Sequence, residues 1–160
     1  MIRAAAATAL LLVAGCIEPP KTNRALVYVN GLQDLTQWDP VMGGRGHESH
    51  DGILQLEPTD SVPVLIASLL DPTPTKILDR LHDPPTVGDV AFHMLLLIFT
   101  MRAEDFAPEG VWISKTEPIR NPIYFVRIEK ETVREKLRER FARMAIARGW
   151  YGDQKPEKPR

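Results

Sequence analysis

The sequence predicts a mostly α-helical fold in one small domain, with a short β-hairpin before the last helix. Two observations favour this fold class. Apolar residues recur at three- and four-residue steps along several segments, and residues that can cap helices precede some of them. The length of 160 residues suits one domain with an apolar core. Fourteen prolines exceed the usual share of roughly 5 %, so we expect short helices joined by irregular loops.

The first predicted helix covers residues 24–38. Its apolar side chains have the spacing of one helix face, and they are Ala25, Leu26, Val29, Leu32 and Leu35. An alternative interpretation takes residues 26–29 as a strand that ends in the Asn-Gly pair after it, because this dipeptide is a strong hairpin signal. Residues 39–58 contain several glycines and are expected to form a loop around a short apolar piece at 53–56.

A clearer helix is predicted over residues 60–70. Asp60 or Ser61 can cap this helix, and Pro63 would fall in its first turn, where a missing N–H group is harmless. We expect the helix to stop at Asp71, because the proline that follows cannot continue it.

The next predicted helix begins at Thr86 and runs to Phe99. Thr86 and Asp89 have the spacing of a capping box. The helix is apolar nearly all round, so it is expected to be the central, buried helix of the domain. It is far too short to cross a bilayer, which takes about 20 residues.

Residues 62–98 resemble a single HEAT-type helical repeat, whose first helix ends in Leu-x-Asp-Pro-like residues before a second helix packs back on it. Here residues 69–72 read Leu-Leu-Asp-Pro, and residues 87–91 read Val-Gly-Asp-Val-Ala. The sequence departs from that family at Thr73–Thr86, where fourteen residues replace a tight turn, and it shows no second copy. The resemblance therefore implies one helix pair inside a mixed domain.

The C-terminal third is expected to contain the hairpin and the last helix. Residues 111–113 and 123–126 are β-branched and aromatic, which favours two short strands. The last helix should begin near Thr132 and end at Gly149. One stripe of this helix is apolar: Val133, Leu137, Phe141 and Met144. The opposite face is charged: Arg134, Lys136, Arg138, Glu139, Arg140 and Arg143. Such a face is either solvated or in contact with anionic headgroups or an acidic partner.

The N-terminus has the order of an export signal. Arg3 supplies one positive charge, residues 4–14 are small and apolar, and the small residues Ala14 and Gly15 come directly before Cys16. An apolar run of about eleven residues is too short to span a bilayer. Cys16 is also the only cysteine in the chain, so it has no partner for an internal disulfide.

This arrangement resembles the lipobox of bacterial lipoproteins. The resemblance implies that residues 1–15 are a signal peptide removed before Cys16, and that the Cys16 thiol carries a diacylglycerol. Residues 16–24 would then be a lipidated tether, residues 25–150 the helical domain, and residues 151–160 a disordered tail. Ile17, rather than an aspartate, follows the cysteine, which resembles the signal for the outer membrane and a place in the bacterial envelope facing the periplasm.

The densest group of polar side chains lies in the glycine-rich segment 43–52. It includes His47 and His50, and imidazole with carboxylate can bind zinc. The spacing departs from that of helical zinc proteases, and the glycines argue against a helix that would place both rings on one face. A third ligand would have to come from His82 or Asp83. The plainer interpretation is a polar surface loop, and no metal ligand is assigned.

A second candidate is the pair formed by Asp89 and His93, which are four residues apart and so share a helix face. The pair could orient an imidazole for acid–base catalysis. The plainer interpretation is that Asp89 caps its helix and His93 bonds to a buried polar neighbour. No serine has the glycines of a nucleophile elbow, and no phosphate-binding glycine motif occurs in the sequence.

These features favour a non-catalytic, membrane-anchored module that binds an envelope protein or a cell-wall polymer. We expect no cofactor. Nucleic acid is not expected as a partner, because the formal net charge is −1 and the isoelectric point is near 6.4. Two alternatives stay open: a small metal-dependent hydrolase that uses His47 and His50, and a structural spacer without a specific partner.

Overall fold

The computed structural model describes residues 21–38, 44, 46–77, 83–113, 126–128 and 130–151. These residues form a mostly helical fold, as predicted. The elements in chain order are α1 (Lys21–Gly31), η1 (Leu32–Asp34), α2 (Glu48–Gln55), α3 (Pro58–Ser68), α4 (Val87–Phe99), η2 (Ala103–Glu109), β1 (Trp112–Ile113), β2 (Val126–Arg127) and α6 (Glu131–Ala147). Among them, no helix has both the length and the apolar character needed to cross a membrane.

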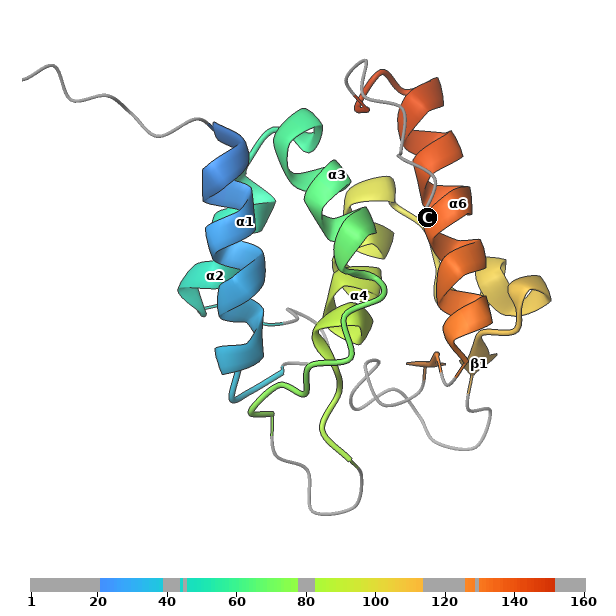
Figure 1. The fold of residues 1–160 in the computed structure, drawn as a ribbon, viewed down its shortest axis with the longest axis horizontal. Coiled ribbons are helices and arrows are strands. Elements are labelled where there is room, and N and C mark those ends of the chain that lie inside the picture. The colour runs from blue at the N-terminus through green and yellow to red at the C-terminus, as the bar shows by residue number, and fades with distance from the viewer. Residues whose placement is uncertain are drawn as a thin grey trace, which may run out of the picture.

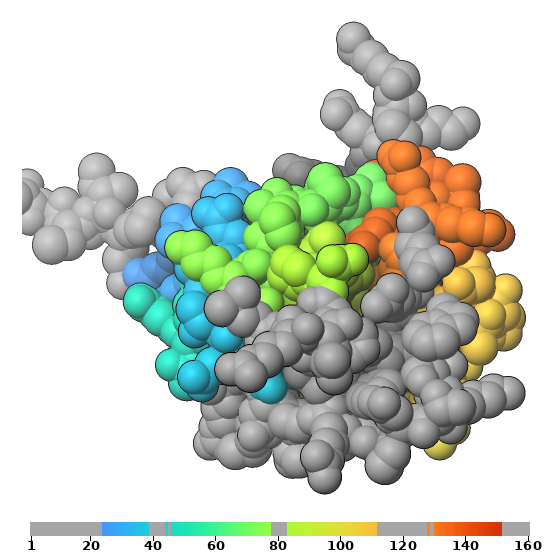
Figure 2. Space-filling model, turned by 90° about the horizontal axis from the view of Figure 1, so that it is seen from below, coloured from blue at the N-terminus to red at the C-terminus, as the bar shows by residue number. Residues whose placement is uncertain are grey.

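Helix α3 lies at the centre of the arrangement and contacts α1, α4 and α6 (Figure 1). Helix α2 packs on α1, and α4 runs antiparallel to α3 behind it. Seen from below, α1 lies on one side, α3 and α4 in the middle, and α6 with η2 on the other side (Figure 2). The antiparallel pair of α3 and α4 is the helix pair that the sequence predicts, while its resemblance to a HEAT repeat stays a prediction.

The burial of α4 on most sides is confirmed, although α3 and not α4 takes the central position among the helices. Phe92 on α4 contacts the rings of Phe106 and Phe141, with ring centroids 5.5 and 6.0 Å away. Phe106 and Phe141 stack on each other at 5.0 Å. This aromatic contact joins α4, η2 and α6, and each such pair adds about 1 kcal/mol to simple burial.

The start of α4 agrees with the predicted capping box. The Thr86 hydroxyl accepts a hydrogen bond from the Asp89 backbone N–H at 3.2 Å, and the Asp89 carboxylate accepts one from the Thr86 backbone N–H at 2.9 Å. Ahead of this cap, residues 73–75 run antiparallel to residues 85–87, with the Thr75 N–H donating to the Pro85 carbonyl at 2.9 Å.

Helix α1 differs from its prediction at both ends. It begins at Lys21, so the last part of the predicted tether is helical, and it ends at Gly31 rather than near Trp38. The helical interpretation is nevertheless correct and the strand with a hairpin turn is wrong. Leu35 and Trp38 are buried although they lie beyond the helix, because the chain after η1 still packs against the core. Their apolar spacing therefore continues the pattern of a helix face beyond the residue at which the helix ends.

The prediction of a loop over residues 39–58 is wrong where α2 forms. His47 is the N-cap of α2, and Ile53 is fully buried. Helix α3 also begins earlier than predicted, since its N-cap is Glu57 and its first residue is Pro58. Asp60 and Ser61 are therefore not caps, and Pro63 lies in the second turn, where it removes one helix hydrogen bond.

The strands and the last helix are close to their predicted positions. Trp112 pairs with Arg127 and Ile113 with Val126 in an antiparallel pair of two residues each, while residues 123–125 lie outside the described residues. Helix α6 starts at Glu131 without a side-chain cap, so Thr132 does not begin it. Gly149 follows its end with φ +68°, a left-handed conformation that favours glycine, as predicted.

Candidate functional site

The segment around His47 is an ordered helix start. The His47 Nδ1 accepts a hydrogen bond from the Ser49 backbone N–H at 3.3 Å, and the Asp51 carboxylate accepts one from the Gly46 N–H at 2.9 Å. Asp51 also lies in the first turn of α2, where a negative charge interacts favourably with the helix dipole. The prediction of a polar surface loop is therefore wrong from Glu48 onwards, and one nitrogen of His47 is used in capping.

His50 is the buried histidine of this segment, with 1 % of its surface exposed. Its ring packs edge-on against Trp38, with centroids 5.7 Å apart, and a Cβ atom added to Gly44 would lie 3.1 Å from it. Its Nδ1 is 3.2 Å from an oxygen of Asp51. Burial lowers the pKa of His50, and the hydrogen bond with Asp51 opposes that shift. The ring is therefore neutral at pH 7.

His93 also packs against Trp38. Its ring on α4 is 5.8 Å from the Trp38 ring, and it is also buried. Burial lowers the pKa of His93 to about 4, against a smaller opposing effect of the Asp89 charge. Asp89 itself bonds to Thr86 and Arg134. The plainer interpretation of Asp89 as a cap is confirmed.

We call Trp38, His50 and His93 the histidine–tryptophan cluster. The Trp38 Nε1, the His50 Nε2 and the His93 Nε2 are all buried, and each lacks a hydrogen-bond partner in the described part of the structure. The predicted bond from His93 to a buried polar neighbour is thus not formed by its Nε2. Each such atom costs about 1–3 kcal/mol relative to a bonded one. The cluster joins the chain after η1, α2 and α4, and sequence spacing alone could not bring these three segments together.

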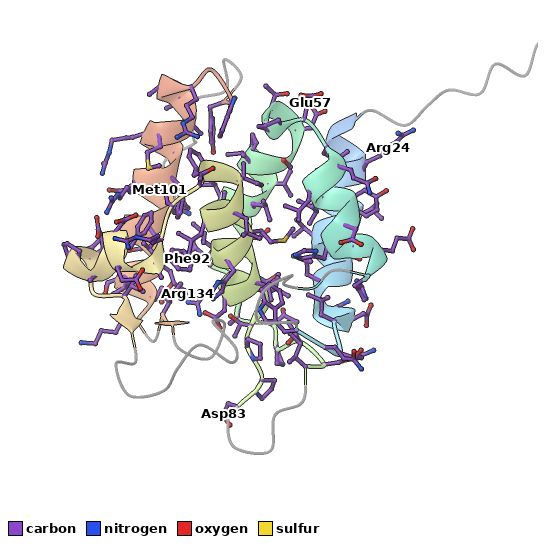
Figure 3. The ribbon with its side chains drawn as sticks, turned by 180° about the vertical axis from the view of Figure 1, so that it is seen from behind. Arg24, Glu57, Asp83, Phe92, Met101 and Arg134 are labelled. Atoms are coloured by element: carbon purple, nitrogen blue, oxygen red, sulfur yellow. The ribbon has the colours of Figure 1, made fainter. Side chains whose placement is uncertain are left out.

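The cluster could hold a metal only with further ligands. Across the described ranges, no three side chains of histidine, cysteine, aspartate or glutamate are placed to bind one ion. Asp83 is exposed at the end of the molecule opposite Arg24 and Glu57 (Figure 3). His82 lies outside the described residues. The described residues therefore do not supply His50 with the third ligand that the sequence suggested.

The charged face of α6 is only partly available to solvent. Arg134, predicted on that face, is mostly buried and donates to the Asp89 carboxylate at 2.8 Å and to the Leu69 carbonyl at 3.0 Å. It thereby ties α6 to the end of α3 and the start of α4.

Arg140 is used in a similar way. It donates to the Asp105 carbonyl at 2.8 Å and to the Glu109 carboxylate at 2.5 Å, and its guanidinium lies 4.2 Å from the Phe106 ring centroid. Arg140 is therefore only partly exposed on the charged face. The exposed arginines of α6 and its C-cap lie farther along, at Arg143 and Arg148.

Comparison of the chain with protein-family models, with curated proteins and with solved structures finds no match.

Proposed function

We propose that the chain is a lipoprotein of the bacterial envelope, held on a membrane by lipid on Cys16, whose helical domain binds another envelope component. The observation that carries this proposal is the order of Arg3, the apolar residues 4–14 and the small residues directly before Cys16. Two or more acyl chains at one cysteine would hold the protein stably, since each buried methylene contributes about 0.8 kcal/mol. Ile17 favours the outer membrane as its location.

A binding role rather than catalysis is supported by how the described polar residues are used. His47 caps α2, and Asp89 and Arg134 fasten three helices together. Arg140 fastens η2 to α6. These side chains have structural roles, and they include Asp89, one of the two residues that the sequence offers for acid–base chemistry.

Cys16→Ser tests the anchor. The variant should accumulate as uncleaved precursor and take up no fatty-acid probe in cells, because serine lacks the thiol that the lipid requires. The matched control adds Ala67→Cys, on an exposed position of α3, to Cys16→Ser. It restores one thiol per chain and should also remain unlabelled. Fatty-acid label on the Cys16→Ser chain would overturn the proposal.

The binding role is tested by in-cell crosslinking of a tagged chain, followed by mass spectrometry and metal analysis of the same sample. A stoichiometric envelope partner without metal supports a binding module. Near-equimolar zinc that is lost on His50→Gln, without a partner, would instead favour the metal-dependent hydrolase. A sample with neither a reproducible crosslink nor metal would favour the spacer.

A further inference from the structure

We infer that the end of the domain where α1 begins, and where α4 and α6 finish, rests on the lipid surface. We call it the tether end. This inference depends on the proposed lipid anchor. It specifies the face of the domain that contacts the lipid headgroups.

The reach of the tether limits how the domain can sit. Residues 17–20 separate Cys16 from the start of α1 at Lys21, and two of them are prolines. A fully extended chain advances at most about 3.6 Å per residue, so the start of α1 lies within about 18 Å of the lipidated cysteine. The far end of the domain therefore cannot turn towards the headgroups while the tether end faces away.

Several helices reach the tether end together. Figure 1 shows α1 and α3 beginning there and α4 and α6 finishing there. The ring of Phe99, at the end of α4, contacts Phe141 at 5.4 Å and Trp150 at 5.0 Å, so the last turns of α4 and α6 are neighbours. Figure 3 places Arg24 and Glu57 at this end, while Asp83 lies at the opposite one.

Two exposed apolar side chains lie at the tether end. Five large apolar residues are well exposed among those described. Two of them, Leu26 and Val27, lie at the middle of α1, with 51 % and 66 % of their surface exposed. Leu97 and Ile146, each 54 % exposed, lie in the last turns of α4 and α6. Single exposed apolar residues are ordinary on any surface. Here two of the five, Leu97 and Ile146, lie at the end where the lipid would attach.

The polar neighbours of these residues suit an anionic headgroup region. Arg143 and Arg148 are exposed near the end of α6, and the Arg148 guanidinium lies 4.8 Å from both the Phe99 and the Trp150 ring centroids. Tryptophan and arginine beside apolar side chains are typical of membrane interfaces. Acids share this end: Glu57 is exposed, and Asp60 lies in the first turn of α3. Glu139, at the middle of α6, lies 4.0 Å from Arg143.

The test uses the lipidated protein in vesicles of phosphatidylethanolamine and phosphatidylglycerol. Lipid occupies the Cys16 thiol, so a cysteine added elsewhere is the one free thiol and can carry a nitroxide spin label. Ile146→Cys and Leu97→Cys report on the tether end. Glu131→Cys is the matched control, because it is exposed on the same helix as Ile146 and about 22 Å away along the helix axis.

The measurement is the relaxation of each label by oxygen, which concentrates in lipid, and by a water-soluble nickel chelate. The ratio of the two effects should be several-fold higher at positions 146 and 97 than at position 131. Equal ratios on a lipidated protein would overturn the orientation and leave the anchor intact. A protein without lipid on Cys16 would overturn both. If the cysteine at position 146 reacts with an aqueous thiol reagent in vesicles but is protected from it in cells, this end contacts a protein partner and not lipid, which would overturn the inference.

Discussion

Arg134 shows how a residue predicted on the surface becomes structural. Its side chain and that of Asp89 are only 13 % and 17 % exposed, and their ion pair crosses from α6 to the start of α4. The sequence predicts Arg134 on the charged face, but the residue directly follows Val133 and, at about 100° per residue, lies at the edge of the apolar stripe. The sequence could not reveal that the start of α4 approaches this edge, because that contact joins residues 45 positions apart.

Replacing Arg134 should therefore destabilise the domain. Arg134→Ala leaves Asp89 partly buried without its cation and removes the bond to the Leu69 carbonyl. We expect a loss of about 2–4 kcal/mol in the free energy of unfolding, measured by denaturant titration. Lys136→Ala, at an exposed position on the same helix, is the control and should change it by no more than about 0.5 kcal/mol. Equal effects of the two substitutions would contradict the structural role of Arg134.

The buried histidines predict loss of stability in acid. The pKa of His93 is lowered to about 4 from 6.5, so between these pH values the unfolded chain binds more protons than the folded one. Stability from this group is thus complete above pH 6.5 and falls as the pH decreases towards 4, by up to about 3 kcal/mol. His50, whose pKa is also lowered, acts in the same direction.

His93→Leu tests this dependence, since leucine has a similar volume and no proton to gain. The free energy of unfolding of this variant should fall less between pH 6.5 and pH 4 than that of the unaltered protein. It should not be lower at pH 7, because the substitution removes a buried nitrogen without a partner among the described residues. Parallel curves for the two proteins would contradict the assignment of the buried, neutral imidazole.

At the scale of elements, local signals predicted some boundaries and missed others. Helix α4 was predictable because the Thr86 and Asp89 capping box and a long apolar run agree. Helix α2 was not, because its cap is a histidine and its sequence contains a glycine and few apolar residues. Its stability comes from packing on α1, which is a tertiary effect that spacing does not encode.

The close approach of α3 and α4 gives a prediction at the same scale. A Cβ atom at Gly88, in the first turn of α4, would lie 2.7 Å from the Leu69 carbonyl oxygen and 3.0 Å from that of Asp71. Helix propensity alone would make Gly88→Ala stabilising by up to about 1 kcal/mol. We expect the opposite sign, a lower midpoint of thermal unfolding, because backbone atoms must move apart. A higher midpoint would contradict the close packing of the two helices.

At the scale of the whole molecule, the sequence predicts the fold class but not how distant segments meet. The helical class and the buried helix were predictable from apolar spacing, whereas the histidine–tryptophan cluster was not, because it unites residues 38, 50 and 93. The tether end likewise depends on the arrangement of helices in space. The proposed anchor depends on the sequence alone, since residues 1–20 lie outside the described ones.

The most direct test of the proposed anchor is mass spectrometry of the N-terminal peptide of the protein extracted from membranes. The proposal predicts that the mature chain begins at Cys16 and that its sulfur carries a diacylglycerol. A chain that begins at another residue, or a free thiol on Cys16, would contradict it.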